Sequence, residues 1–135
     1  MDRSRDLGRE HEFFGLMPML AVADVGATTA YFCDVLGFEV DFVVGEPPVH
    51  ARIMTGGGIY IHLMEVDEAD PEPSGELRIY VGRDLDGLFE EYQARNVDVV
   101  FPPKSQPWGL REFAVRAISG HVLRYGSEII ESSAD

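Results

Sequence analysis

The chain has 135 residues, with 24 Asp or Glu against 11 Lys or Arg, so its formal net charge is −13. No cluster of Lys or Arg occurs, which excludes the basic patch that a nucleic-acid-binding surface needs. No apolar run reaches the roughly 18 residues of a membrane helix, and Cys33 is the single cysteine and cannot form an internal disulfide, so we expect one cytoplasmic domain without a membrane partner.

The first half of the chain predicts a strand, a helix and three further strands. The apolar run 13–23 predicts the first strand, which Pro18 interrupts because proline removes a hydrogen bond from a sheet ladder. Apolar residues at a spacing near 3.6 predict a helix over 24–36, with Asp24 as its N-cap. Alternating apolar residues then predict strands over 38–44, 49–55 and 59–66.

The second half repeats this order after an acidic, proline-bearing segment, 67–74, which predicts a linker. Its predicted elements are a strand at 76–81, a helix at 84–95 and strands at 97–101, 111–117 and 121–126. Between the strands at 97–101 and 111–117 we expect a loop, PPKSQPWG, which carries the only tryptophan, Trp108. The repeated order indicates a tandem duplication of one half-domain, with a cleft between the two copies.

These boundaries give one domain made of two modules. The expected parts are a flexible leader at 1–12, module one at 13–66, the linker at 67–74, module two at 75–126, and a C-terminal tail at 127–135. The domain therefore spans 13–126 and belongs to the α+β class, with mixed, mostly antiparallel sheets curved around a cleft.

The strands carry a second, mixed face opposite their apolar face. In the run 59–64, Tyr60, His62 and Met64 alternate with apolar residues, and in 76–81 Glu76, Arg78 and Tyr80 do the same. Ordinary solvent exposure explains such a face in an antiparallel sheet. Tyrosine, histidine and methionine recurring on it favour instead a concave, partly covered pocket.

Two stretches resemble a known family: MPMLAVADVGATTAYFCDVLGFEVDF, from Met17 to Phe42, and QPWGLREFAVRAISGHVLRYG, from Gln106 to Gly126. They resemble the glyoxalase, bleomycin resistance protein and extradiol dioxygenase superfamily (the vicinal oxygen chelate fold), and most of all bleomycin resistance proteins. The resemblance implies paired βαβββ modules that commonly form homodimers. It leaves the function open, because this superfamily includes lyases, isomerases, dioxygenases and proteins that only bind.

The family's enzymes usually hold a divalent metal ion with four ligands, and the resemblance places these at Met17, His62, Glu76 and Arg124. Only His62 and Glu76 could serve, because a thioether suits hard divalent ions poorly and a guanidinium is a permanent cation without an acceptor. We expect Arg124 to pair with Glu76 if their strands are neighbours. His50 lies in a different strand run and is not expected to complete a metal site. The sequence therefore predicts no metal and no other cofactor.

The resemblance implies a small-molecule-binding protein that sequesters an antibiotic or a related ligand in a dimer cleft and so confers antibiotic resistance. A bleomycin-type antibiotic, cationic and with flat rings, would suit the acidic chain and its aromatic residues. Arg78 on the same face favours an anionic or aromatic ligand instead, and Trp108 could also be a loop anchor packed into the core. The alternative is a lyase, isomerase or dioxygenase with an atypical active site. The expected ligand-binding residues are Asp41, Phe42, Tyr60, His62, Met64, Glu76, Arg78, Tyr80, Trp108, Gly109 and Arg124.

Overall fold

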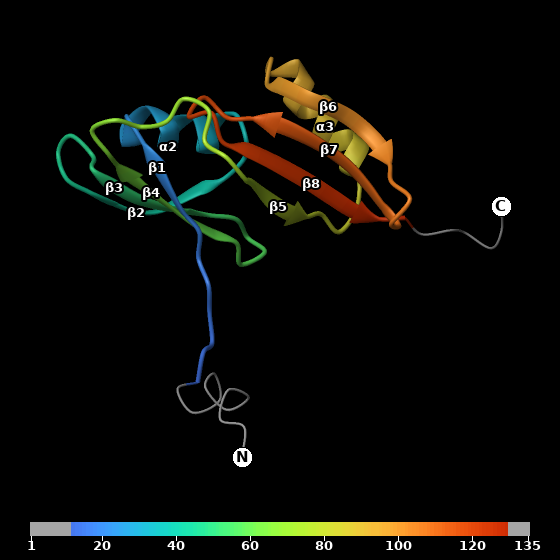
Figure 1. Ribbon diagram of the computed structural model, residues 1–135, viewed down its shortest axis with the longest axis horizontal. Helices are drawn as coiled ribbons and strands as arrows, with labels where there is room; N and C mark the ends of the chain where they lie inside the picture. The colour runs from blue at the N-terminus through green and yellow to red at the C-terminus, as the bar shows by residue number, and fades with distance from the viewer. Residues whose placement is uncertain (1–11, 130–135) are drawn as a thin grey trace.

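A computed structural model describes residues 12–129, so most of the expected leader and the end of the expected tail lie outside the described residues. The chain forms two modules of the same order, strand, helix and three strands (Figure 1). Module one contains β1 (Met19–Val22), α2 (Val25–Asp34), β2 (Glu39–Val44), β3 (His50–Met54) and β4 (Tyr60–Glu65). Module two contains β5 (Glu76–Tyr80), α3 (Leu85–Ala94), β6 (Asp98–Ser105), β7 (Leu110–Arg116) and β8 (Val122–Glu128).

Each module forms its own four-stranded sheet, and the two sheets have the same topology. The strand orders are β1-β4-β3-β2 and β5-β8-β7-β6, in which β1 and β5 run parallel to their neighbours and the other pairs are antiparallel. A β-bulge follows Val40 in β2, and another follows Val99 in β6. The expected α+β fold of paired βαβββ modules is therefore confirmed.

Each sheet is covered by a helix on one side only: α2 packs on module one's sheet and α3 on module two's (Figure 1). Asp24 caps α2 as expected, accepting a hydrogen bond from the amide of Ala27 at 2.9 Å. The residues between sheet and helix, such as Phe32 and Phe113, are fully buried and form one core cluster that extends through both modules. Apolar burial thus occupies one side of each sheet and leaves the other side open.

Three strand boundaries differ from those predicted by more than one residue. The run 13–23 forms a strand only from Met19, and residues 12–18 lead away from the sheets and leave Phe14 99% exposed (Figure 1). Strand β6 continues through Pro102 and Pro103 to Ser105, where a loop was expected. It can do so because β6 is an edge strand, and an edge strand tolerates proline. Strand β8 runs to Glu128, two residues into the expected tail.

The two modules are joined where the ends of their helices meet. The hydroxyl of Tyr92, on α3, donates a hydrogen bond to the carbonyl oxygen of Leu36 at 2.6 Å and lies 3.0 Å from the hydroxyl of Tyr125. Arg95 donates to the carbonyl oxygen of Val35 at 2.8 Å, which satisfies a carbonyl at the end of α2. Within residues 12–129 no helix is both long and apolar enough to cross a membrane.

Candidate ligand-binding site

The open side of module two's sheet, which we call face two, carries an ion-pair cluster centred on Arg124. Its guanidinium donates from Nη1 to Glu76 Oε1 and from Nη2 to Glu112 Oε1, both at 3.0 Å. Parallel pairing of β5 with β8 and antiparallel pairing of β7 with β8 bring the three residues together. The hydrogen bond with Glu112 raises the pKa of Arg124, against the opposing effect of desolvation, and Glu76 adds to the rise. The expected pairing of Arg124 with Glu76 is present.

Glu112 is the member of this cluster that the sequence did not single out as a site residue. It is only 2% exposed, which is unusual for a carboxylate and requires a partner. In the sequence, Glu112 alternates with the apolar residues Phe113 and Val115, a pattern that indicates the open side of the sheet and not burial. Its carboxylate binds Arg124 on β8, and Arg78 on β5 comes within 4.0 Å of it.

Two aromatic rings flank the guanidinium of Arg124. Its carbon Cζ lies 5.2 Å from the ring centroid of Phe101 and 6.0 Å from that of Trp108, distances typical of cation–π contacts. Trp108 is 55% exposed, so it is a wall of face two rather than a loop anchor in the core. Gly109 follows it with φ +89° and has open space where a Cβ would be.

The open side of module one's sheet, which we call face one, carries a pair of histidines. His50 Nε2 and His62 Nδ1 lie 2.8 Å apart, and the ring of Phe42 meets both rings edge-on. Desolvation, then repulsion from His50 and Arg52, lowers the pKa of His62. His50 was not expected to complete a metal site because it lies in a different strand run. Pairing of β3 with β4 makes it a neighbour of His62.

Arg52 forms the second polar group of face one. Its guanidinium carbon lies 5.0 Å from the ring centroids of both Phe42 and Tyr60, and its Nε donates to Asp41 Oδ2 at 2.6 Å. Met17 Sδ lies 3.8 Å from Arg52 Nη1. Three expected ligand-binding residues, Asp41, Phe42 and Tyr60, therefore converge on an arginine that the sequence did not single out.

The polar pairs of the two faces occupy corresponding places in the duplicated fold. Phe42 is opposite Arg52, two residues after His50, and Phe101 is opposite Ala114, two residues after Glu112. The pair His50–His62 in module one thus corresponds to the pair Glu112–Arg124 in module two. The same fold position carries a pair of histidines on face one and an ion pair on face two.

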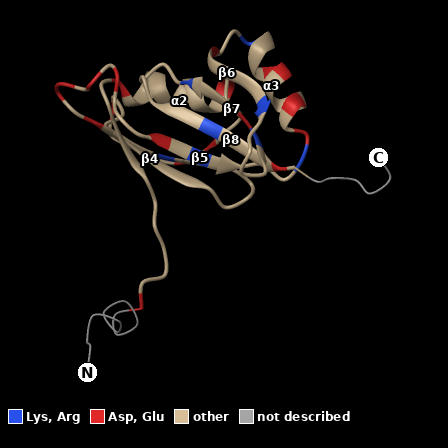
Figure 2. Cartoon of the chain, turned by 45° about the vertical axis from the view of Figure 1, so that its right-hand side comes forward, with Lys and Arg blue, Asp and Glu red and all other residues tan. Residues whose placement is uncertain are grey.

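The remaining expected residues lie at the edges of these clusters. Met64 is opposite His50 across the sheet. Arg78 and Tyr80 lie on β5, beside the seam between the modules, where a groove of about 450 Å³ also includes Tyr60. Basic residues of β5 and β8 lie side by side, whereas acidic residues lie along α3 and on connecting loops (Figure 2). Within residues 12–129, no hydrogen bond or ion pair joins face one to face two.

The residues at the family's metal positions do not fit a divalent ion. The guanidinium of Arg124 already binds Glu76, and it would repel a cation placed beside that carboxylate. The sulfur of Met17 is next to another guanidinium, that of Arg52. Among residues 12–129 no group of three or more His, Cys, Asp or Glu could hold an ion, so the donors at these positions do not make up a metal centre.

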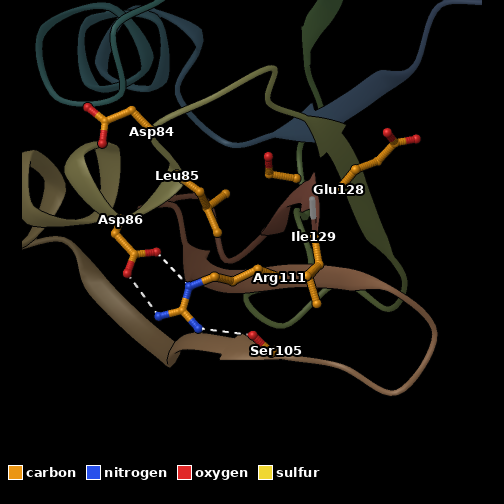
Figure 3. A pocket seen from close by; sticks show the side chains of 8 residues that line it. Asp84, Leu85, Asp86, Ser105, Arg111, Glu128 and Ile129 are labelled. Atoms are coloured by element: carbon orange, nitrogen blue, oxygen red, sulfur yellow. Dashed lines mark hydrogen bonds and ion pairs between the residues drawn. The ribbon is translucent and has the colours of Figure 1, made fainter. Parts of the chain in front are cut away.

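A second cavity, of about 360 Å³, lies at the start of α3 and includes none of the expected ligand-binding residues (Figure 3). Arg111 crosses it and donates from Nε and Nη2 to the two carboxylate oxygens of Asp86, each at 2.8 Å. A third donor of Arg111 reaches Ser105 Oγ at 3.2 Å, and the hydrogen bond from Arg111 lowers the pKa of Asp86. The donors that line this cavity are used in holding α3 to the sheet.

Known structures share this fold over most of their length. The bleomycin-binding protein of Streptomyces verticillus, crystallised with copper(II)-bleomycin, is 31% identical, with a TM-score of 0.69 over 87% of this chain and 98% of that one. TioX from Micromonospora sp. ML1 is 25% identical, with a TM-score of 0.72 over 87% of this chain and all of that one (100%). The fosfomycin resistance protein FosX of Listeria monocytogenes, 18% identical with a TM-score of 0.69 over 87% of this chain and 96% of that one, shares the fold.

No curated protein matches the sequence. Residues 16–125 match the family described as the Glyoxalase/Bleomycin resistance protein/Dioxygenase superfamily. This match includes both modules, face one and face two. The chain belongs to the glyoxalase/bleomycin resistance protein/dioxygenase superfamily.

Proposed function

We propose that the protein is a cytoplasmic homodimer that binds and sequesters a small molecule, an antibiotic or a related compound, without metal catalysis. The observation that carries this proposal is the Arg124 cluster. A guanidinium held by Glu76 and by the buried Glu112 stands where the family's enzymes need a metal ligand. Such a site offers a fixed charge and aromatic surfaces, which bind molecules, and no open coordination position, which catalysis by a metal requires.

Aromatic surface on both faces supports a ligand with flat rings. Trp108 is more than half exposed beside Arg124, and Phe42 and Tyr60 flank Arg52. Aromatic side chains bind flat rings by offset stacking, and arginine planes extend such a surface. The similarity to a bleomycin-binding protein is consistent with this ligand class.

A dimer would supply the wall that each face lacks within one chain. Both faces are open, and exposed apolar side chains lie on residues 12–18 and on the edge strand β2. Phe14 and Leu16 are 99% and 91% exposed, and surfaces of this kind commonly mark protein interfaces. Two copies that cover each other's open faces would form two closed clefts, as twofold symmetry requires.

Binding of metal-free bleomycin tests the proposal. Isothermal titration calorimetry of the EDTA-treated protein should show saturable binding, weakened at least about tenfold by Trp108→Ala, because one stacking surface is lost. Light scattering after gel filtration should give the mass of two chains. A monomer that binds neither bleomycin nor any aromatic ligand would contradict the proposal.

The histidine pair supports a second candidate, an isomerase or lyase that uses His62 as a general base without a metal. The lowered pKa of His62 keeps its imidazole unprotonated at neutral pH, as a general base must be, and His50 is a hydrogen-bonding partner that can orient the ring. Glu76 suits this role less well because Arg124 holds its carboxylate. Conversion of a bound ligand, followed by mass spectrometry and abolished by His62→Gln, would support this candidate over sequestration.

A further inference from the structure

The seam between the two modules forms a groove with an unusual charge for this protein. It has a volume of about 450 Å³, which is within the range of small-molecule sites. The chain has 24 acidic residues, yet no Asp or Glu is among the described residues that line the groove. The only permanent charge among them is that of Arg78.

Arg78 differs from the other arginines of the open faces because its donors are largely unused. Arg52 and Arg124 each form hydrogen bonds with carboxylates at 2.6 to 3.0 Å. Arg78 comes within 4.0 Å of Glu112 Oε2 and forms no hydrogen bond with another residue of 12–129. Glu112 is already bound to Arg124, so the half-exposed guanidinium of Arg78 keeps donors that meet no other acceptor among the described residues.

Two tyrosines complete the groove, one from each module. Tyr80 follows Arg78 on the same side of β5 and is 67% exposed, which leaves its ring available to a ligand. Tyr60 lies across the seam on β4, with Arg52 on its ring, so its position is fixed. A groove lined by one guanidinium and two amphipathic rings suits a flat molecule with a carboxylate at one end.

We infer that the seam groove binds a planar aromatic monoanion, with its carboxylate on Arg78 and its ring against Tyr60 and Tyr80. This inference names a ligand class for the proposed binding function and rests on that function. One cation neutralises one negative charge, and a dianion would leave a second charge unbalanced in a protein of net charge −13. A cationic ligand would meet Arg78 and find no acidic residue in the groove to compensate the repulsion.

The test compares three ligands of the same ring and different charge by isothermal titration calorimetry of the full chain: 2-naphthoate, 2-naphthamide and 2-naphthylmethylammonium. Arg78→Gln removes the proposed anchor, and Arg83→Gln is the matched control, since it makes the same charge change at an exposed residue outside the groove. We expect 2-naphthoate to bind wild type and Arg83→Gln alike, and to bind Arg78→Gln at least about tenfold more weakly. The amide and the ammonium compound should bind wild type more weakly than the carboxylate does.

Equal binding of the carboxylate and the amide, equal binding by the two variants, or no binding of 2-naphthoate to wild type would overturn the inference. Thermal melting of both variants checks that each is folded. A parallel titration with bleomycin separates this inference from the proposed function. If bleomycin binds and 2-naphthoate does not, the inference about the groove is wrong and the proposed sequestration stands. If 2-naphthoate binds in a manner that depends on Arg78 and bleomycin does not bind, the inference about the groove stands and bleomycin is excluded as the ligand.

Discussion

At the residue scale, the stability of the site depends on the pair formed by Glu112 and Arg124. Arg124→Met leaves the buried carboxylate of Glu112 with only a distant arginine, Arg78, at 4.0 Å. We expect this variant to lower the free energy of unfolding by about 3 kcal/mol, since a buried charge without a partner is strongly destabilising. Urea denaturation measures the change.

The double variant Glu112→Met/Arg124→Met is the control for this prediction. It removes both charges and replaces them with apolar side chains of similar length, so it should recover most of the lost stability. Glu76 loses its partner in both variants but is about one third exposed and remains hydrated. Equal stability of the single and double variants would show that the buried charge does not explain the loss.

On face one, we expect the pKa of His62 to depend on its neighbour His50. His50→Gln should raise the pKa of His62 toward its ordinary value, because repulsion from His50 is one cause of the depression. Desolvation, the larger cause, remains, so the rise should be incomplete. NMR titration of the ring protons measures the pKa of His62 in the wild type and in the variant. The pKa of His121, which is lowered by its own burial, should be the same in both proteins.

The sign of the pH effect on stability follows from this depressed pKa. Below about pH 6.5 the unfolded chain takes up a proton at His62 at a pH where the folded chain does not. The contribution of His62 to the free energy of unfolding is therefore constant above this pH, and it lowers that free energy as the pH falls below it. The wild type should lose more stability than His50→Gln between about pH 7 and pH 5, and a larger loss in the variant would contradict the assignment.

At the scale of the elements, the starts of α2 and α3 differ in how closely a glycine approaches the N-cap. A Cβ at Gly87 would lie 2.3 Å from Asp84 Oδ2, whereas a Cβ at Gly26 would lie 3.5 Å from Asp24 Oδ1. Gly26→Ala should therefore stabilise the protein by about 0.4 to 1 kcal/mol through the unfolded chain. Gly87→Ala should give no such gain, because it displaces the capping carboxylate.

Thermal unfolding of both glycine variants checks this contrast. Asp84→Ala alone shows the contribution of the cap and is expected to destabilise by about 1 kcal/mol. If Gly87→Ala stabilised as much as Gly26→Ala, the cap of α3 would not depend on the space that the glycine leaves.

The hydroxyl group of Tyr92 makes a buried hydrogen bond between α3 and the end of α2, where the two modules meet. Tyr92→Phe should destabilise by about 1 to 3 kcal/mol, because the carbonyl of Leu36 loses a buried donor. Tyr125→Phe removes only the contact between hydroxyls and should have a smaller effect. Burial raises the pKa of Tyr92 to about 12, so the contrast should persist at mildly alkaline pH in denaturation experiments.

The regular elements could be predicted from the sequence because each has a strong local signal. Alternation in 59–64 and the aspartate N-caps at 24 and 84 are local patterns, and the corresponding strand and helices are present. The continuation of β6 through Pro102 could not be predicted, because only the sheet order shows that it is an edge strand. Sequence spacing likewise could not bring His50 to His62, since that depends on the register between two strands.

At the scale of the whole molecule, the proposed ligand binding depends on what covers the two open faces. Module one carries five of the eleven expected ligand-binding residues and module two carries six, and the seam groove is lined by residues of both. We expect Phe14→Ser together with Leu16→Ser to weaken the proposed dimer at least about tenfold, because both apolar side chains are almost fully exposed in one chain. Sedimentation over a range of protein concentrations measures this, and Ile118→Ser, at another exposed apolar position, is the control.

The central claim of the proposed function is that the protein binds its ligand without a metal ion. The decisive experiment is calorimetric titration of the EDTA-treated protein with metal-free bleomycin and with 2-naphthoate, each repeated after addition of manganese, nickel or zinc. We expect at least one of these ligands to bind with the same affinity before and after metal addition. Binding that appears only after a divalent ion is added, and that His62→Gln or Glu76→Gln abolishes, would refute metal-free sequestration, as would no binding under either condition.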